Sequence, residues 1–125
     1  MANTKLMYDA VDELLNGIVD VYSEEADEDA NYPYAVTEIN LVAPGVVNRY
    51  EIEINVWDKY KTMSRANNLM DKIEEKLDKE VIRKENCTLY IARGNTRGKV
   101  LDEDKTIKRV RALFILDYTE GRIEE

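Results

Sequence analysis

The sequence predicts an α+β domain in which two amphipathic helices pack on a four-stranded, mainly antiparallel sheet. Three observations predict it: two segments carry apolar residues at helical spacing, four segments alternate or run apolar, and turn residues separate the strands of each pair. The expected order is helix, strand, strand, helix, strand, strand. A chain of 125 residues is the usual size of one domain, so residues 1–125 are treated as a single domain.

The first helix is expected within residues 4–22, where Asn3 or Thr4 can act as the N-cap. Gly17 inside this segment costs about 1 kcal/mol relative to alanine, which indicates close packing or fraying near the end. The apolar residues recur on one stripe: Leu6, Met7, Ala10, Val11, Leu14, Leu15, Ile18 and Val19.

An acidic connector is expected at residues 23–33. Carboxylates near a helix C-terminus meet the negative end of the helix dipole and favour leaving the helix. Pro33 restricts the residues around it to extended backbone, so the connector is expected to run extended from the helix into the sheet.

Two strands are expected at residues 34–42 and 49–57, joined by a turn at APGVVN. In the second strand, alternation places one set of side chains toward the core and the other toward water or a partner: Tyr50, Ile52, Ile54 and Val56 against Arg49, Glu51, Glu53 and Asn55. Trp57 is in phase with the polar set, so it either completes the core or contacts a partner.

The second amphipathic helix is expected at residues 63–79, with Thr62 or Ser64 as the cap and Ala66, Leu69, Met70, Ile73 and Leu77 on its apolar stripe. Two strands follow at 87–94 and 107–118. In the last strand Val110, Ala112, Phe114, Leu116 and Tyr118 are expected to face the core.

Leu113 and Ile115 make that strand apolar on its other face as well. Such a strand is central and covered by helices on both faces, or it is buried against another subunit. Between the last two strands, residues 94–106 are expected to form a long loop. Loops of this length in compact domains are functional or mobile, so this loop is a candidate contact surface.

Composition argues against several classes of function. With 26 acidic and 18 basic residues the net charge is −8, which disfavours binding to phosphate backbones. No stretch approaches the ~20 apolar residues that cross a bilayer, and we expect a soluble, cytoplasmic chain. There is no histidine, and Cys87 is the single cysteine, so an internal disulfide and histidine-dependent catalysis are both excluded. We expect no enzyme activity, no catalytic residues, no metal and no cofactor.

One acidic pattern resembles a calcium-binding loop. Asp27, Asp29, Asn31 and Glu38 fall on positions 1, 3, 5 and 12 of an EF-hand. Position 6, which requires glycine for a sharp turn, is Tyr32, and Pro33 follows it. The spacing of the ligands therefore matches an EF-hand, but the glycine that allows the loop to turn sharply is missing. The segment is interpreted as a solvated connector.

The order of elements from about Leu6 to Tyr118 resembles the small tail terminator proteins of long-tailed bacteriophages, also called tail completion or tail-to-head joining proteins. The resemblance is carried by YPYAVTEI, EIEINVW, SRANNLMDKIEEKL and RVRALFILDY. It implies a ring, usually a hexamer, that caps the tail tube, stops its polymerisation and joins the tail to the head connector. The implied partners are further copies of the chain, the tube protein and the head-completion protein, in the tail or neck of a virion assembled in the host cytoplasm.

The residues suggest how such a ring would be built. Carboxylates of the connector are candidates to line the channel and repel transiting DNA: Glu24, Glu25, Asp27, Glu28 and Asp29. Candidates for subunit or partner contacts are Trp57, Arg93, Asn95, Arg97, Lys99, Val100, Leu101, Leu113 and Ile115.

Two alternatives stay open. The first is an acidic adaptor or regulatory protein that binds a basic protein partner. The second is a related head-closure or connector protein. A persistent monomer would favour the adaptor.

Overall fold

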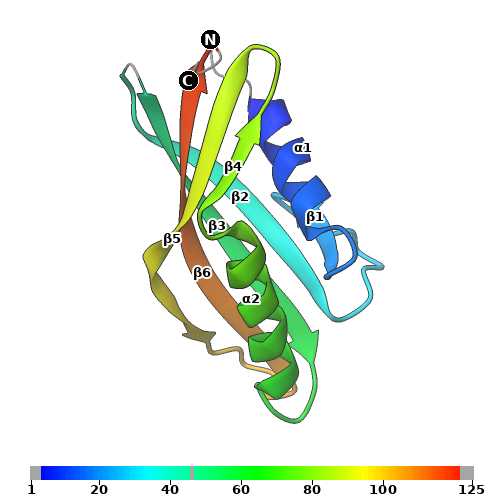
Figure 1. Cartoon of the computed structure of the whole chain (residues 1–125). Helices are drawn as coiled ribbons and strands as arrows, with labels where there is room; N and C mark the ends of the chain where they lie inside the picture. The colour runs from blue at the N-terminus through cyan, green and yellow to red at the C-terminus, as the bar shows by residue number, and fades with distance from the viewer. Residues whose placement is uncertain (1–3, 46, 122–125) are drawn as a thin grey trace.

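The computed structural model describes residues 4–45 and 47–121. Figure 1 shows one curled sheet, a half-barrel, with both helices on its concave side. In chain order the elements are α1 (Thr4–Leu15), β1 (Asp20–Ser23), β2 (Tyr34–Ala43), β3 (Val47–Lys59), α2 (Ser64–Leu77), β4 (Glu80–Arg83), β5 (Cys87–Val100) and β6 (Ile107–Glu120).

The predictions of a four-stranded sheet and of the order helix, strand, strand, helix, strand, strand are wrong, because a further strand follows each helix and the sheet has six strands in the order β1-β2-β3-β6-β5-β4. The four expected strands form its centre, and every neighbouring pair is antiparallel except β1 with β2. The two additional strands are the edges, and each is four residues long. Four residues carry too little alternation to stand out from the sequences around them.

The first helix ends at Leu15, earlier than the expected residue 22. Gly17 has φ of +88°, a left-handed conformation that closes helices and is easy only for glycine. The amide of Ile18 donates to the carbonyl of Leu15 at 3.0 Å within this turn. Ile18 and Val19 still pack against the core, which explains why the apolar stripe continues past the end of the helix.

The edge strand β1 is too short to cover all of β2, since their pairing stops at Ser23 with Thr37. Beyond that point Tyr8 of α1 takes over, and its hydroxyl accepts a hydrogen bond from the amide of Ile39 at 2.8 Å. Burial raises the pKa of Tyr8 above its ordinary value.

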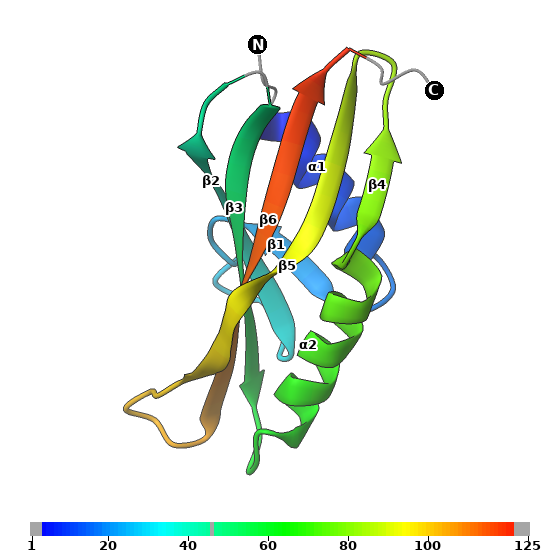
Figure 2. The ribbon, with the colours of Figure 1, turned by 60° about the vertical axis from the view of Figure 1, so that its left-hand side comes forward.

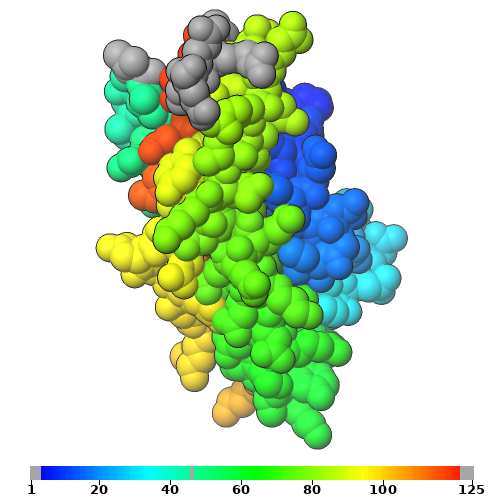
Figure 3. All heavy atoms as spheres, in the orientation of Figure 1, coloured from blue at the N-terminus to red at the C-terminus, as the bar shows by residue number. Residues whose placement is uncertain are grey.

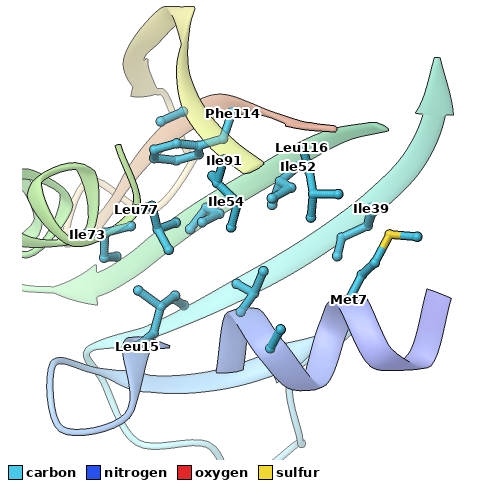
Figure 4. Close-up of a cluster of buried hydrophobic side chains, with 14 of the residues drawn as sticks. Met7, Leu15, Ile39, Ile52, Ile54, Ile73, Leu77, Ile91, Phe114 and Leu116 are labelled. Atoms are coloured by element: carbon cyan, nitrogen blue, oxygen red, sulfur yellow. The ribbon is translucent and has the colours of Figure 1, made fainter. Parts of the chain in front are cut away.

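The core lies between the helices and the concave face of the sheet (Figure 4). Alternate residues of the two central strands fill it as the sequence predicted, with Ile52 and Ile54 of β3 beside Phe114 and Leu116 of β6. The helices contribute Met7, Val11, Leu15, Ala66, Met70, Ile73 and Leu77. Within the described residues, no helix combines the length and apolar character needed to cross a membrane.

The expected long loop at 94–106 is also wrong, because β5 continues to Val100 and the connection is residues 101–106. Pairing of β5 with β6 shifts between Arg93 and Arg97, so three residues of β5 lie opposite Leu113 alone. This bulge bends the hairpin (Figure 2). Charged and small residues, including Gly94 and Gly98, interrupt the apolar pattern here and make the segment look like a loop in the sequence.

Gly94 is required by this bulge, and Gly98 supplies a matched control. A Cβ at Gly94 would lie 2.6 Å from the carbonyl oxygen of Leu113, whereas one at Gly98 meets nothing within 4 Å. We expect Gly94→Ala to lower the free energy of unfolding by about 1–3 kcal/mol, the usual cost of forcing atoms into packed space. Urea denaturation of both variants checks this, and equal losses for Gly94→Ala and Gly98→Ala would contradict it.

Candidate interaction surfaces

The convex face of the sheet, called the outer face below, carries neither helix (Figure 2). Odd-numbered residues of β3 and β6 point toward it, since the even-numbered ones fill the core. Cross-strand ion pairs occupy part of it: Arg49 with Asp117 at 2.8 Å and Arg111 with Glu53 at 2.9 Å. These pairs fix the register of β3 on β6 from the outside.

Asn55 connects the second ion pair to the end of the strand. Its amide nitrogen donates to Glu53 at 2.9 Å, and its amide oxygen accepts from Nε of Arg109 at 2.8 Å. Asn55 is 6% exposed although it points to the outer face. The network is therefore a built part of the surface and not a set of freely moving charges.

The pKa of Glu53 gives this network a pH dependence. The hydrogen bond from Arg111 is the main cause that lowers this pKa. When the pKa of a carboxyl is lower in the folded chain than in the unfolded chain, ionisation stabilises the fold at pH values above the pKa of the unfolded chain. This contribution is lost as the pH falls through the pKa of the folded chain. We therefore expect wild type to lose stability below about pH 4.5 more steeply than Glu53→Gln. Thermal unfolding between pH 7 and pH 3 measures this, and parallel pH profiles would contradict it.

An apolar patch lies between the two ion pairs and extends toward β4. We call it the outer strip: Val81, Tyr90, Ala92, Leu113 and Ile115. Register places Val81 beside Tyr90 and Ala92 beside Ile115 on this face. Val81 is 42% and Tyr90 40% exposed, and the other three are half-buried. β6 is thus a central strand, but helices cover only its core face. Its outer face, with Leu113 and Ile115, is exposed to solvent in the single chain.

Trp57 lies on the outer face at the end of β3 and outside the buried core. Its ring is stacked with Tyr34, with centroids 6.5 Å apart, and the guanidinium of Arg109 lies 4.6 Å from its centroid. Tyr22 and Tyr32 contact Tyr34 in turn. The explanation of Trp57 as part of the core is therefore wrong, and its role as a partner contact stays a prediction.

The acidic connector forms turns, which corrects the expectation of an extended segment. Its first residue, Ser23, belongs to β1, and the amide of Glu24 donates to the carbonyl of Thr37 at 2.7 Å. The amide of Ala30 donates to the carbonyl of Asp27 at 3.0 Å. The bond from Ala30 closes a local turn, so the segment does not follow the extended path expected from Pro33. All five channel candidates are exposed: Glu24, Glu25, Asp27, Glu28 and Asp29.

A cavity of about 380 Å³ lies between the connector and the outer face. Its wall combines the rings of Tyr34 and Trp57 with four carboxylates, and Arg109 is the cation among its lining residues. The carboxylates are Glu24, Glu25, Glu38 and Glu53. Within the described residues, no three acidic or cysteine side chains are grouped in a way that would hold a metal ion.

The distal part of the β5–β6 hairpin carries the remaining contact candidates. Two of them are held by α2 and the residue after it: Arg93 lies 3.7 Å from Asp78, and Arg97 bonds Asp71 at 2.7 Å and also Glu74. The other candidates are exposed or half-buried. Asn95 and Lys99 are exposed, Val100 is half-buried, and Leu101 is 83% exposed.

One structural pair was missed by the sequence analysis. The carboxylate of Asp58 is fully buried and accepts hydrogen bonds from Arg65 at 2.8 and 2.5 Å. Arg65 also covers the ring of Tyr60 at 4.7 Å. The pair connects the end of β3 to the first turn of α2. The one sign of burial in the sequence is that Asp58 is an even-numbered residue of β3, and the even-numbered residues of this strand face the core.

Removal of Arg65 should reveal that burial. Arg65→Ala leaves the buried carboxylate of Asp58 without its partner, which is a costly arrangement, whereas Lys5→Ala breaks only an exposed pair with Asp9. We expect a clear drop in the urea midpoint for Arg65→Ala and almost none for Lys5→Ala. Equal midpoints for the two variants would contradict this explanation.

Searches against protein-family models and curated protein sequences find no match to this chain.

Proposed function

We propose that the chain is a structural subunit that assembles as a ring on the end of a phage tail tube, stops tube polymerisation and joins the tail to the head connector. The outer strip is the observation that supports assembly. An apolar patch on an uncovered sheet face, bordered by ion pairs, has the make-up of a protein contact surface. The tail-end role comes from the sequence resemblance.

A closed ring requires two different patches on each subunit, because each copy contacts its neighbours head to tail. The outer strip is one patch in this proposal. The second is the distal hairpin, where Leu101 stands exposed beyond Val100. Arg97 anchors this hairpin to α2, so it is presented in a fixed position.

The connector supplies the electrostatic part of the proposal. Its five exposed carboxylates add to a chain of net charge −8, and in a ring they would repel the phosphates of passing DNA. Repulsion of this kind keeps a genome from adhering to the channel that it crosses. We expect the ring to be a hexamer, with one face on the tail tube and the other on the head connector.

Assembly and tube capping provide the test. The purified chain is mixed with isolated phage tail tubes, and native mass spectrometry and negative-stain microscopy follow the products. We expect closed rings at tube ends and tails that no longer elongate when tube subunits are added. A chain that stays monomeric at high concentration and leaves tube growth unchanged would refute the proposal.

A second candidate is an acidic adaptor that binds a basic protein partner. The cavity beside the connector favours it, because four carboxylates against the single cation Arg109 among its lining residues suit a lysine or arginine side chain. Oligomeric state separates the two functions. An adaptor stays a monomer and binds a lysine-rich peptide in a salt-sensitive manner, whereas the ring subunit assembles by itself or on the tube.

A further inference from the structure

Aromatic side chains cross the outer face at the end where β2 begins and β3 ends. Register places Tyr34 of β2 opposite Trp57 of β3, and Trp57 opposite Arg109 of β6. Tyr22 of β1 lies 5.8 Å from Tyr34 between ring centroids, and Tyr32, just before β2, lies 5.3 Å from it. Tyr32 is 40% exposed, and the other three rings are half-buried. We call these four rings the aromatic row.

The main chain beneath the aromatic row is already paired. At Tyr34, β2 lies between β1 and β3, and at Trp57, β3 lies between β2 and β6. A segment bound on the row is therefore held by side-chain contacts and not as an added strand. Polyproline II segments are recognised in this way, because they are extended before binding, have no internal hydrogen bonds, and pack their prolines on aromatic-lined surfaces.

The cavity of about 380 Å³ beside the row carries unpaired negative charge. Glu53 is paired with Arg111 across the sheet. The other three carboxylates take part in none of the ion pairs found among the described residues: Glu24, Glu25 and Glu38. In Figure 3 the light-blue and cyan atoms that follow α1 in the chain project at the right-hand edge of the molecule. A cation brought here by a partner would meet carboxylates that are free to pair with it.

Arg109, the cation of the cavity, is held by the sheet itself. Its guanidinium lies 4.6 Å from the centroid of Trp57, and its Nε donates to the amide oxygen of Asn55 at 2.8 Å. Further negative charge lies at the other end of the row, where burial, followed by the charge of Asp27, raises the pKa of Tyr22. Carboxylates therefore outnumber cations along the row, and Arg109 already has its partners.

We propose that the aromatic row binds a proline-rich segment of a partner protein, with prolines packed on the rings and an arginine or lysine of the segment paired with the free carboxylates of the cavity. The inference rests on the adaptor function proposed for this cavity and adds the class of partner. It does not depend on ring assembly, because none of the four rings belongs to the outer strip.

The test compares short synthetic peptides by fluorescence anisotropy: prolines flanked by arginine, the same peptide with alanine in place of each proline, and the proline peptide flanked by glutamate. We expect the arginine-flanked proline peptide to bind the purified chain at least about tenfold more tightly than either of the others. Emission of Trp57, the single tryptophan, should change on binding. Equal binding of the alanine peptide, or no binding at all, would overturn the proposal. A lysine-rich peptide that binds without any preference for proline would overturn it too, but would leave the adaptor function standing.

A ring substitution tests the location of the site. Tyr34→Leu should weaken binding of the proline peptide at least about tenfold, since it removes the central ring but keeps apolar volume. Tyr90→Leu removes a ring from the outer strip on the same face and should bind as wild type does. Tyr32→Leu, at an exposed position outside the strands, is a second variant with little effect on the fold. Equal affinities for Tyr32→Leu and Tyr90→Leu would exclude the aromatic row as the site.

A charge substitution tests the role of the carboxylates. Glu25→Gln combined with Glu38→Gln should reduce the preference for arginine over glutamate flanks severalfold. Glu85→Gln combined with Glu103→Gln, at exposed positions outside the cavity, changes the net charge equally and should retain the preference. Equal loss in both double variants would mean that only the overall charge attracts the peptide, and would refute the pairing at the cavity.

Discussion

Replacing Leu113 and Ile115 together with lysine is expected to abolish ring assembly and leave a folded monomer. Register places Glu53 opposite Leu113 and Glu51 opposite Ile115. Each new lysine therefore gains a cross-strand carboxylate in the monomer. In a subunit contact the same ammonium groups would have to be buried among apolar atoms, which is strongly unfavourable.

The expected size of this effect follows from the area that the two side chains would bury. Burying one large aliphatic side chain contributes about 1.5–3 kcal/mol, and each 1.4 kcal/mol is tenfold in affinity. Assembly should thus weaken by at least about a hundredfold, measured by sedimentation velocity and native mass spectrometry. Thr119→Lys, on the same face of β6 but outside the outer strip, is the matched control. Rings that form equally well from both variants would exclude the outer strip as a contact.

Phe114→Ala is expected to lower the free energy of unfolding by about 3–5 kcal/mol, the usual cost of emptying a large aromatic position in a packed core. The Phe114 side chain is fully buried among Ile52, Ile91 and the residues of α2 (Figure 4). A loss of this size is a large fraction of the total stability of a small domain. Chemical denaturation followed by tryptophan fluorescence of Trp57 measures it.

Phe114→Leu serves as the control, since it keeps most of the apolar volume and should cost considerably less. If both variants lost the same free energy, cavity formation would not be the cause. The comparison with Leu113 and Ile115 is informative as well. Adjacent residues of one strand are expected to have opposite consequences, since one phase fills the core and the other, in the proposed ring, contacts a neighbouring subunit.

The sequence by itself determined the two helices, the four long strands and the phase of the central ones. Periods of 3.6 and 2.0 residues are local properties of the chain, so the spacing of Ile52, Ile54, Phe114 and Leu116 was enough to assign them to the core. The two-sided character of β6 was also visible, because Leu113 and Ile115 stand in the polar phase of the strand.

Only the tertiary structure decided the edges of the sheet and the surfaces built on them. β1 and β4 are strands because neighbours supply their hydrogen bonds, and four residues have no periodicity of their own to reveal it. The distal part of β5 is likewise a strand through its pairing with β6 and the anchoring of Arg97 on α2. The end of α1 at Leu15 depends on the left-handed Gly17, which the apolar stripe does not reveal. Pairing and packing between residues distant in sequence are long-range interactions, and local patterns do not encode them.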